Sequence, residues 1–338
     1  MRIRALTAPL AAALTAILAL SACDQPKIIS VTTTPTTPTA PTTPTTPSAS
    51  TLQLNGTRLV DDQTVQFGVT PLDGSAAVSG TLSNPSVSFT SGQTGTASVC
   101  GQVTVQNTVT AAVSLDSTGS MASTDPGKAR NSAAKTFVSQ LAGDSQAAVL
   151  NFDTSISPSG GLLASKLQQG FTTDKAALNS AIDAATYAGG STNFYDAVID
   201  AASVAAATGR PNPLVLVLTD GVDNSSANSA AQAIAFAKSK GVKVYAVGLD
   251  ATNSIDFTQM EEIASQTGGL FQSNVASADL NAYFAKLYNA FTAQGCLEVR
   301  LNAAPTSGTT VAGTLSVDVT ATGRATSHLS VPFTYTAR

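Results

Sequence analysis

Two patterns of apolar and polar positions divide the chain beyond residue 50. Residues 51–108 and 295–338 alternate apolar with small polar residues in short runs, separated by turns rich in Asp, Gly, Ser and Pro. Alternation with a period of two is typical of half-buried antiparallel strands. Neither segment alone has enough strands for a sandwich, but together they supply about seven. We therefore predict one all-β, sandwich-like module built from both segments.

Residues 109–294, which lie between these segments, have a different pattern: continuous apolar runs alternate with alanine-rich stretches. The clearest apolar runs are 147–152, 214–218 and 242–247. Such runs suit strands that are covered on both faces. The stretches predicted as helices lie near 127–142, 173–186, 194–207, 228–240, 256–267 and 277–293. The alternation predicts a doubly wound, mostly parallel, Rossmann-like α/β sheet flanked by helices and inserted into the β module.

The N-terminal residues have the organisation of an export signal. Arg2 and Arg4 precede an apolar stretch over residues 5–20, and small residues stand just before Cys23. The stretch is too short for a comfortable membrane span. The segment resembles the lipobox of bacterial lipoproteins, which implies removal of residues 1–22 and lipidation of Cys23; the alternative is an ordinary signal peptide with an incidental cysteine. We expect a bacterial cell-envelope protein, anchored to a membrane by its lipid and facing the periplasm or the exterior.

A low-complexity segment follows the lipidated cysteine. Residues 32–50 consist only of Thr, Pro, Ser and Ala, a composition that cannot form a packed core. Frequent proline favours an extended chain, so about twenty residues would span roughly 60 Å. Residues 23–50 are therefore predicted to be a tether.

The charge of the chain bears on its partners, and its cysteine content bears on a disulfide. The chain has 17 Lys and Arg against 21 Asp and Glu, and removal of residues 1–22 takes away two arginines and no acid. An acidic chain with scattered cations argues against nucleic acid as a partner. Apart from Cys23, only Cys100 and Cys296 remain, one on each side of the α/β segment. An even pair in an exported protein predicts a disulfide, with two buried free thiols as the alternative.

Three polar segments follow strands or open helices of the predicted α/β domain. They are residues 116–120 (DSTGS), 189–193 (GGSTN) and 219–221 (TDG). Ligand sites in open sheets lie beyond the carboxyl ends of the strands, so these segments are expected to converge there. Their donors are all oxygen atoms, which favours a hard cation such as Mg²⁺ over zinc or copper.

These segments are similar to the metal-ion-dependent adhesion site of the von Willebrand factor type A (VWA) family, and residues 109–294 resemble its domain. The usual pattern is Asp-x-Ser-x-Ser, a threonine in a later loop, and Asp-Gly after the central strand. The resemblance implies the metal ligands Asp116, Thr118, Ser120, Thr192 and Asp220. Thr118 replaces the usual serine, which keeps the hydroxyl and adds a methyl group. It also implies Mg²⁺, with Mn²⁺ or Ca²⁺ as alternatives, and an open coordination position for a carboxylate of a protein partner.

Polar neighbours of these segments have weaker interpretations. Asn193 and Asp196 are predicted to cap the following helix or to brace the metal loop. Asp153, Asp223 and Asp250 also follow apolar runs, where aspartate forms turns, caps helices or lies on the rim of a site.

The leading functional hypothesis is capture of a protein or matrix ligand through the metal. One alternative is a constitutive assembly component of an envelope complex, whose metal only holds the loops together; a metal-dependent hydrolase is a third. The single histidine, His328, lies in the β module, and no glycine-lysine phosphate loop is visible. We therefore predict that the protein is not an enzyme.

Overall fold

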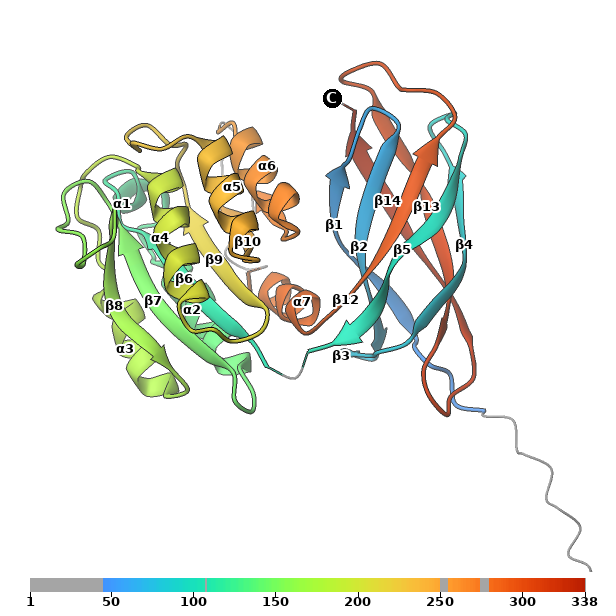
Figure 1. Cartoon of the computed structure of the whole chain (residues 1–338), viewed down its shortest axis with the longest axis horizontal. Coiled ribbons are helices and arrows are strands. Elements are labelled where there is room, and N and C mark those ends of the chain that lie inside the picture. Colours follow the sequence, from blue (N-terminus) through green and yellow to red (C-terminus); the bar gives the residue numbers. More distant parts are fainter. Residues whose placement is uncertain (1–44, 107, 250–254, 274–279, 338) are drawn as a thin grey trace, which may run out of the picture. The chain divides into compact units, whose positions relative to one another are not determined.

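The computed structural model describes residues 45–106, 108–249, 255–273 and 280–337 (Figure 1). The predictions for the export signal, for Cys23, for the tether before residue 45 and for Asp250 lie outside these residues. In the described ranges, no helix is long and apolar enough to cross a membrane.

The α/β domain is built on one sheet with the strand order β11-β10-β9-β6-β7-β8. The strands are β6 (Thr110–Asp116), β7 (Gln146–Phe152), β8 (Ser165–Thr172), β9 (Pro213–Thr219), β10 (Lys243–Gly248) and β11 (Phe271–Ser273). Neighbouring strands are parallel except at the edge, where β8 runs antiparallel to β7. The predicted mostly parallel sheet is confirmed.

Helices cover both faces of this sheet (Figure 1). They are α1 (Met121–Thr124), α2 (Ala129–Gln140), α3 (Lys175–Ala184), α4 (Phe194–Ala206), α5 (Ala230–Ser239), α6 (Thr258–Thr267) and α7 (Leu280–Thr292). The consecutive residues Val215 and Leu216 of β9 belong to opposite cores, the first with α4 and α5 and the second with α2 and α7. Because both faces are buried, the strand needs an uninterrupted apolar run, which explains its sequence pattern.

The β module consists of two antiparallel sheets that share one core. Its strands are β1 (Thr51–Leu59), β2 (Thr64–Asp73), β3 (Ala76–Ala77), β4 (Thr81–Phe89), β5 (Gly95–Val105), β12 (Ala293–Leu301), β13 (Thr310–Thr320) and β14 (Ser327–Thr336). One sheet has the order β1-β2-β12-β5, with β3 beside β2, and the other has the order β14-β13-β4. Phe67 of the first segment packs on Phe333 of the second, with ring centroids 4.8 Å apart. The predicted insertion of an α/β domain into a β module is therefore confirmed.

A disulfide joins the two strands that lead into and out of the inserted domain. Cys100 of β5 is bonded to Cys296 of β12, which confirms the predicted bridge and rules out the free thiols. At the ends of these strands Val105 pairs with Ala293, so the chain leaves the module and returns to it at neighbouring positions. At the end of the predicted tether, Ser48 and Ala49 are buried in the module rather than extended in solvent.

Candidate functional site

The site lies where three loops meet at one edge of the α/β sheet. The first loop, residues 116–120, follows β6. The second, residues 189–193, leads into α4, and the third, residues 219–221, follows β9. The Gly119 amide donates a 3.0 Å hydrogen bond to the carbonyl of Gly190. A Cβ on Gly119 would stand 3.1 Å from the carbonyl oxygen of Gly189, which is closer than most side chains tolerate. A side chain at position 119 would therefore press on the backbone of the loop at residues 189–193.

A chain of hydrogen bonds connects the aspartates of the first and third loops. The Thr118 amide donates to Asp116 Oδ1 over 2.8 Å. The hydroxyls of Thr118 and Ser120 are 3.2 Å apart and hydrogen-bonded. Ser120 Oγ in turn donates to Asp220 Oδ1 over 2.9 Å. Four of the residues predicted from the sequence thus belong to one connected group.

Thr192, the remaining predicted ligand, lies beside the third loop. A Cβ on Gly221 would stand 3.0 Å from the Thr192 hydroxyl oxygen. The backbone of Thr192 is fixed by two hydrogen bonds with Asn224, one from its amide to the Asn224 side chain and one to its carbonyl from the Asn224 amide, both 2.9 Å long. The Thr192 hydroxyl is therefore held next to the residue that follows Asp220.

Asp116 is a buried carboxylate with few compensating charges. It is fully buried, and desolvation raises its pKa to about 6, with the nearby Asp220 adding to the rise. Hydrogen bonds from Thr118 and from the Thr219 hydroxyl, the latter 2.5 Å long, act in the opposite direction. An adjacent cation would stabilise the ionised form of this group.

A buried arginine behind the first loop was not anticipated from the sequence. Arg130 of α2 has no exposed surface, and its guanidinium lies 4.5 Å from the centre of the Tyr187 ring. Its Nη2 donates to the Ala185 carbonyl, while Nε and Nη1 have no hydrogen-bond partner among the described residues. Desolvation lowers the pKa of Arg130, and the negative charges of Asp116 and Asp125 act in the opposite direction.

The helical spacing of apolar residues in α2 could have predicted the burial of Arg130. Arg130 precedes the buried Ala133, Ala134 and Phe137 by three, four and seven positions, so it falls on the face of α2 that packs on the sheet. A buried arginine close to Asp116 supplies part of the positive charge that this carboxylate lacks.

Two of the neighbouring aspartates fix the loops around the candidate ligands. Asp153, which is 1% exposed, accepts hydrogen bonds from the amides of Gly190 at 2.7 Å and Ser155 at 2.5 Å. Asp223 accepts a 2.9 Å hydrogen bond from the amide of Tyr195, in the first turn of α4. Asp153 thus braces the second loop. Asp223, which lies just after the third loop, caps the N-terminus of α4.

Asn193 and Asp196 have other roles than capping. Asn193 occupies the N-cap position of α4 without a side-chain hydrogen bond to the helix, and its buried Oδ1 has no partner in the described parts of the chain. Asp196 accepts hydrogen bonds from the amides of Ala227 at 2.8 Å and Asn228 at 3.1 Å. The Asn193 side chain therefore does not cap α4, and the Asp196 side chain binds the segment that leads into α5. Bracing of the metal loop by either residue stays a prediction.

The donor set fits a hard divalent cation. Across the described ranges, no three His, Cys, Asp or Glu side chains gather as a metal cluster, so a cation at this edge would depend on hydroxyl oxygens in addition to the two aspartates. Oxygen-only donors, two of them anionic, suit Mg²⁺, Mn²⁺ or Ca²⁺. His328 takes no part, because it pairs with Asp318 at 2.7 Å in the β module.

Several solved structures align with part of this chain. Proximal thread matrix protein 1 from the mussel byssus aligns with 20% identity and a TM-score of 0.46 over 58% of this chain and 49% of its own, so the aligned part spans about half of that protein. A von Willebrand factor type A protein from Catenulispora acidiphila aligns with 13% identity and a TM-score of 0.43, over 86% of this chain and 74% of its own. The vWF domain of the pilus tip protein Mfa5 from Porphyromonas gingivalis aligns with 13% identity and a TM-score of 0.41, over 56% of this chain and 97% of its own.

Sequence comparison identifies the inserted domain. No curated protein sequence matches the chain significantly. The sequence profile of the von Willebrand factor type A domain, however, matches residues 112–288, which include the three loops and just over half of the chain. The protein therefore belongs to the von Willebrand factor type A domain family.

Proposed function

We propose that the three loops form a metal-ion-dependent adhesion site through which the protein captures a protein or matrix ligand. The observation that carries the proposal is the hydrogen-bonded chain from Asp116 through Thr118 and Ser120 to Asp220. It gathers carboxylate and hydroxyl oxygens from loops a hundred residues apart at one sheet edge. The metal ligands in this proposal are Asp116, Thr118, Ser120, Thr192 and Asp220.

The donor chemistry favours Mg²⁺, with Mn²⁺ or Ca²⁺ as alternatives. When bound, such a cation supplies a Lewis-acidic position that a carboxylate of the partner can occupy. The three hydroxyl donors are neutral, so within this ligand set only Asp116 and Asp220 offset the charge of the cation. The chain's own contribution is to orient these donors, since Asp153 and Asp223 fix the second and third loops.

The assembly-component alternative gives the metal the task of holding the loops together. Protein hydrogen bonds already do this, because Gly119 is bonded to Gly190 and Ser120 to Asp220. This arrangement supports the adhesion function over a purely structural metal. A hydrolase has no support from a described nucleophile and general base, since His328 is engaged in the β module.

The cellular setting belongs to the same proposal. The signal-like residues 1–22 and Cys23 support a location on a membrane of the bacterial cell envelope, with attachment through the lipid and the protein facing the periplasm or the exterior. The Thr/Pro-rich segment would then present the adhesion site to partners at a distance from the membrane.

Calorimetric titration of residues 24–338 with MgCl₂ and with MnCl₂ tests the metal site. We expect one ion per chain, with binding lost in Asp116→Asn and Asp220→Asn and retained in Asp144→Asn, which changes an exposed aspartate outside the site. Absence of binding, or equal binding by the Asp116→Asn variant, would refute the site.

Capture from envelope extract then tests the adhesion function. We expect partners to be retained by the wild-type chain in Mg²⁺ and released in EDTA, and not to be retained by Asp116→Asn. Thermal unfolding in EDTA separates the alternatives. An adhesion site predicts loss of partners from a chain that stays folded, whereas a structural metal predicts a large fall in the melting temperature.

A further inference from the structure

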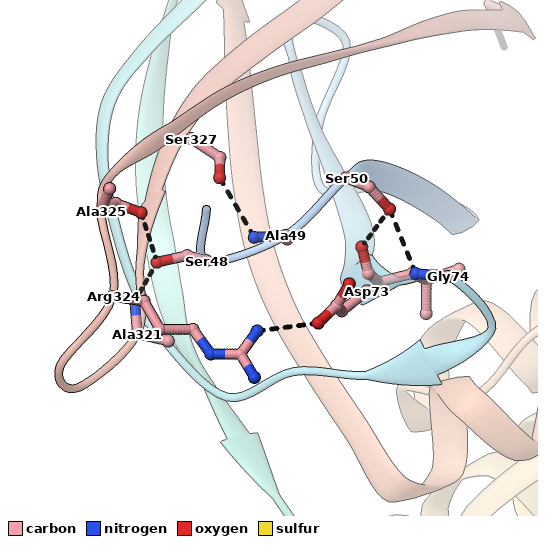
Figure 2. Close-up of polar contacts among 10 residues, drawn as sticks. Ser48, Ala49, Ser50, Asp73, Gly74, Ala321, Arg324, Ala325 and Ser327 are labelled. Carbon is pink, nitrogen blue, oxygen red and sulfur yellow. Dashed lines mark hydrogen bonds and ion pairs between the residues drawn. The ribbon is translucent and has the colours of Figure 1, made fainter. Parts of the chain in front are cut away.

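Hydrogen bonds and an ion pair fix the point where the tether meets the β module (Figure 2). Ser48 has no exposed surface and Ala49 is 3% exposed. These residues come before β1, and their composition alone predicted no packing. We call residues 48–50, with the turns at 72–74 and 321–327 that hold them, the clasp.

Ser48 and Ala49 are bound to the turn between β13 and β14. Ser48 Oγ donates to the Ala325 carbonyl over 2.9 Å and accepts from the Ala321 amide over 2.6 Å. The Ser48 amide also donates to Ala325 O, and the amide of Ala49 donates to the Ser327 hydroxyl over 3.1 Å. A single buried serine therefore bridges both sides of this turn, nearly 280 residues further along the chain.

Ser50 is bound to a second turn, the one that follows β2. Its hydroxyl donates to the Leu72 carbonyl and accepts from the Gly74 amide, both at 3.1 Å. An ion pair between Arg324 and Asp73, 2.8 Å long, joins this turn to the first one, as Figure 2 shows. The incoming chain is thus held by two turns from different sheets, which are also tied to each other.

The position of the clasp matters because of where the inserted domain is attached. Thr51 at the start of β1 pairs with Leu72 near the end of β2, and Val69 of β2 pairs with Gly295 of β12. The tether therefore enters the module at the same end at which β5 leaves it and β12 returns.

A pull between the tether and the inserted domain would act at this one end. Hydrogen bonds of an antiparallel ladder run across the strands. A strand pulled from its end, away from its neighbour, loses these bonds one pair at a time rather than all together. Without additional contacts, β1 would peel from β2 starting at the Thr51–Leu72 pair.

We propose that the clasp is a mechanical anchor that diverts a pull on the tether away from the β1–β2 ladder. Load arriving at Ser48 passes into the β13–β14 turn and, through Ser50, into the β2–β3 turn, so both sheets share it. On the inserted-domain side, the Cys100–Cys296 disulfide limits peeling of β5 from β12 to the few residues beyond the bridge. The proposal rests on the proposed function only in that ligand capture would supply the load.

Single-molecule pulling on residues 23–338 tests the anchor. One handle is attached to the thiol of Cys23 and the other to Ser157→Cys, an exposed position in the α/β domain, with the Cys100–Cys296 disulfide intact and EDTA present. The readout is the rate of the first extension step at fixed load. Detachment of residues 48–63 would release roughly 50 Å of contour length. Because no metal is needed, failure of the adhesion site would not affect the result.

The critical comparison uses two matched serine substitutions. Ser48→Ala removes the clasp hydroxyl, whereas Ser91→Ala removes a hydroxyl that bonds in the same way to the carbonyl and amide of Ala312. Ser91 lies beyond Phe89, which pairs with Gly313, at the end of the module away from the clasp. We expect the roughly 50 Å step to occur about 5- to 30-fold faster in Ser48→Ala and at the wild-type rate in Ser91→Ala.

Two results would overturn the proposal. One is equal detachment rates in Ser48→Ala and Ser91→Ala; the other is a wild-type chain that already peels at β1 as readily as Ser48→Ala. If Ser48→Ala does not fold, Ser50→Ala removes the contacts to the second turn from an exposed position and carries the same expectation.

Discussion

The Ser120 hydroxyl donates a 2.9 Å hydrogen bond to Asp220, a residue one hundred positions further along the chain. Ser120 follows β6 and Asp220 follows β9, and these strands are neighbours in the sheet. Parallel pairing places the carboxyl ends of both strands at the same edge. Two loops distant in sequence therefore lie in contact in the folded chain.

This contact makes Ser120 a sensitive position for metal affinity. Ser120→Ala would remove both a proposed ligand and one of the two hydrogen bonds, from Ser120 and from Thr124, that orient the Asp220 carboxylate, so we expect Mg²⁺ affinity to fall about 10- to 100-fold. Ser123→Ala is the control, because Ser123 is exposed in α1, the short helix that begins directly after Ser120, and its hydroxyl donates to the Ser120 carbonyl. Calorimetric titration measures both. Equal affinity in the two variants would remove Ser120 from the ligand set.

Metal affinity should also depend on pH. Burial raises the pKa of Asp116 to about 6, and a cation binds only the ionised carboxylate. Above pH 6 the group is already ionised, so affinity should be nearly constant. Below it, protons compete, and affinity should fall about tenfold per pH unit. Titrations at pH 7.5, 6 and 5 check this, and a flat profile would contradict a direct role for the Asp116 carboxylate.

Gly190 should not tolerate a side chain. A Cβ there would stand 2.3 Å from Asp153 Oδ1, which is far inside contact distance. Gly190→Ala should therefore displace the second loop and cost about 1–3 kcal/mol of stability as well as metal affinity. Gly160→Ala is a matched control, because a Cβ at Gly160 meets nothing within 4 Å. Urea denaturation of both variants tests the difference, and equal midpoints would contradict it.

Arg130 is expected to stabilise the metal-free site. Arg130→Met would leave the buried carboxylates of Asp116 and Asp125 without their neighbouring cation, at a cost of about 3 kcal/mol. Bound Mg²⁺ would neutralise Asp116 instead, so the loss should be smaller in Mg²⁺ than in EDTA. Lys135→Met on the same helix breaks only an exposed ion pair with Asp183 and should cost about 1 kcal/mol or less. Losses that are identical in Mg²⁺ and EDTA would argue against this charge compensation.

The disulfide should stabilise the β module. Cys100 and Cys296 are separated by 196 residues, and closing a loop of that length is worth about 5 kcal/mol in a chain-entropy estimate. Folding of the inserted domain already brings the two strands together, so we expect a smaller effect, about 2–4 kcal/mol. Denaturation of Cys100→Ser/Cys296→Ser, followed by circular dichroism, measures it. A variant as stable as the oxidised wild type would show that the inserted domain alone positions β5 and β12.

The sequence predicts the buried parts of the fold well and its edges poorly. Strand β9 is covered on both faces and carries the continuous apolar run that such burial requires. Strand β8 was not predicted, because it is an antiparallel edge strand of intermediate burial and its residues, SKLQQGFT, follow neither a continuous nor an alternating pattern.

The candidate site shows the same division. Its loops could be found because short oxygen-bearing segments recur at strand ends, where the topology collects them. Asp223 caps α4 through a contact between segments that are distant in sequence, so the residues around Asp223 alone could not predict this role. The buried Ser48 is an extreme case, because its partners lie 273 and 277 residues away and its own neighbourhood is only Thr, Pro, Ser and Ala.

The pairing of Val105 with Ala293 has a consequence for the evolution and engineering of this chain. The inserted segment starts and ends at paired strand positions, and the Cys100–Cys296 disulfide lies a few residues from them. Replacing residues 109–292 by a domain whose ends lie close together should therefore leave the strand register of the β module unchanged. Chimaeras that exchange the metal-binding domain for an unrelated fold should retain the framework that displays it.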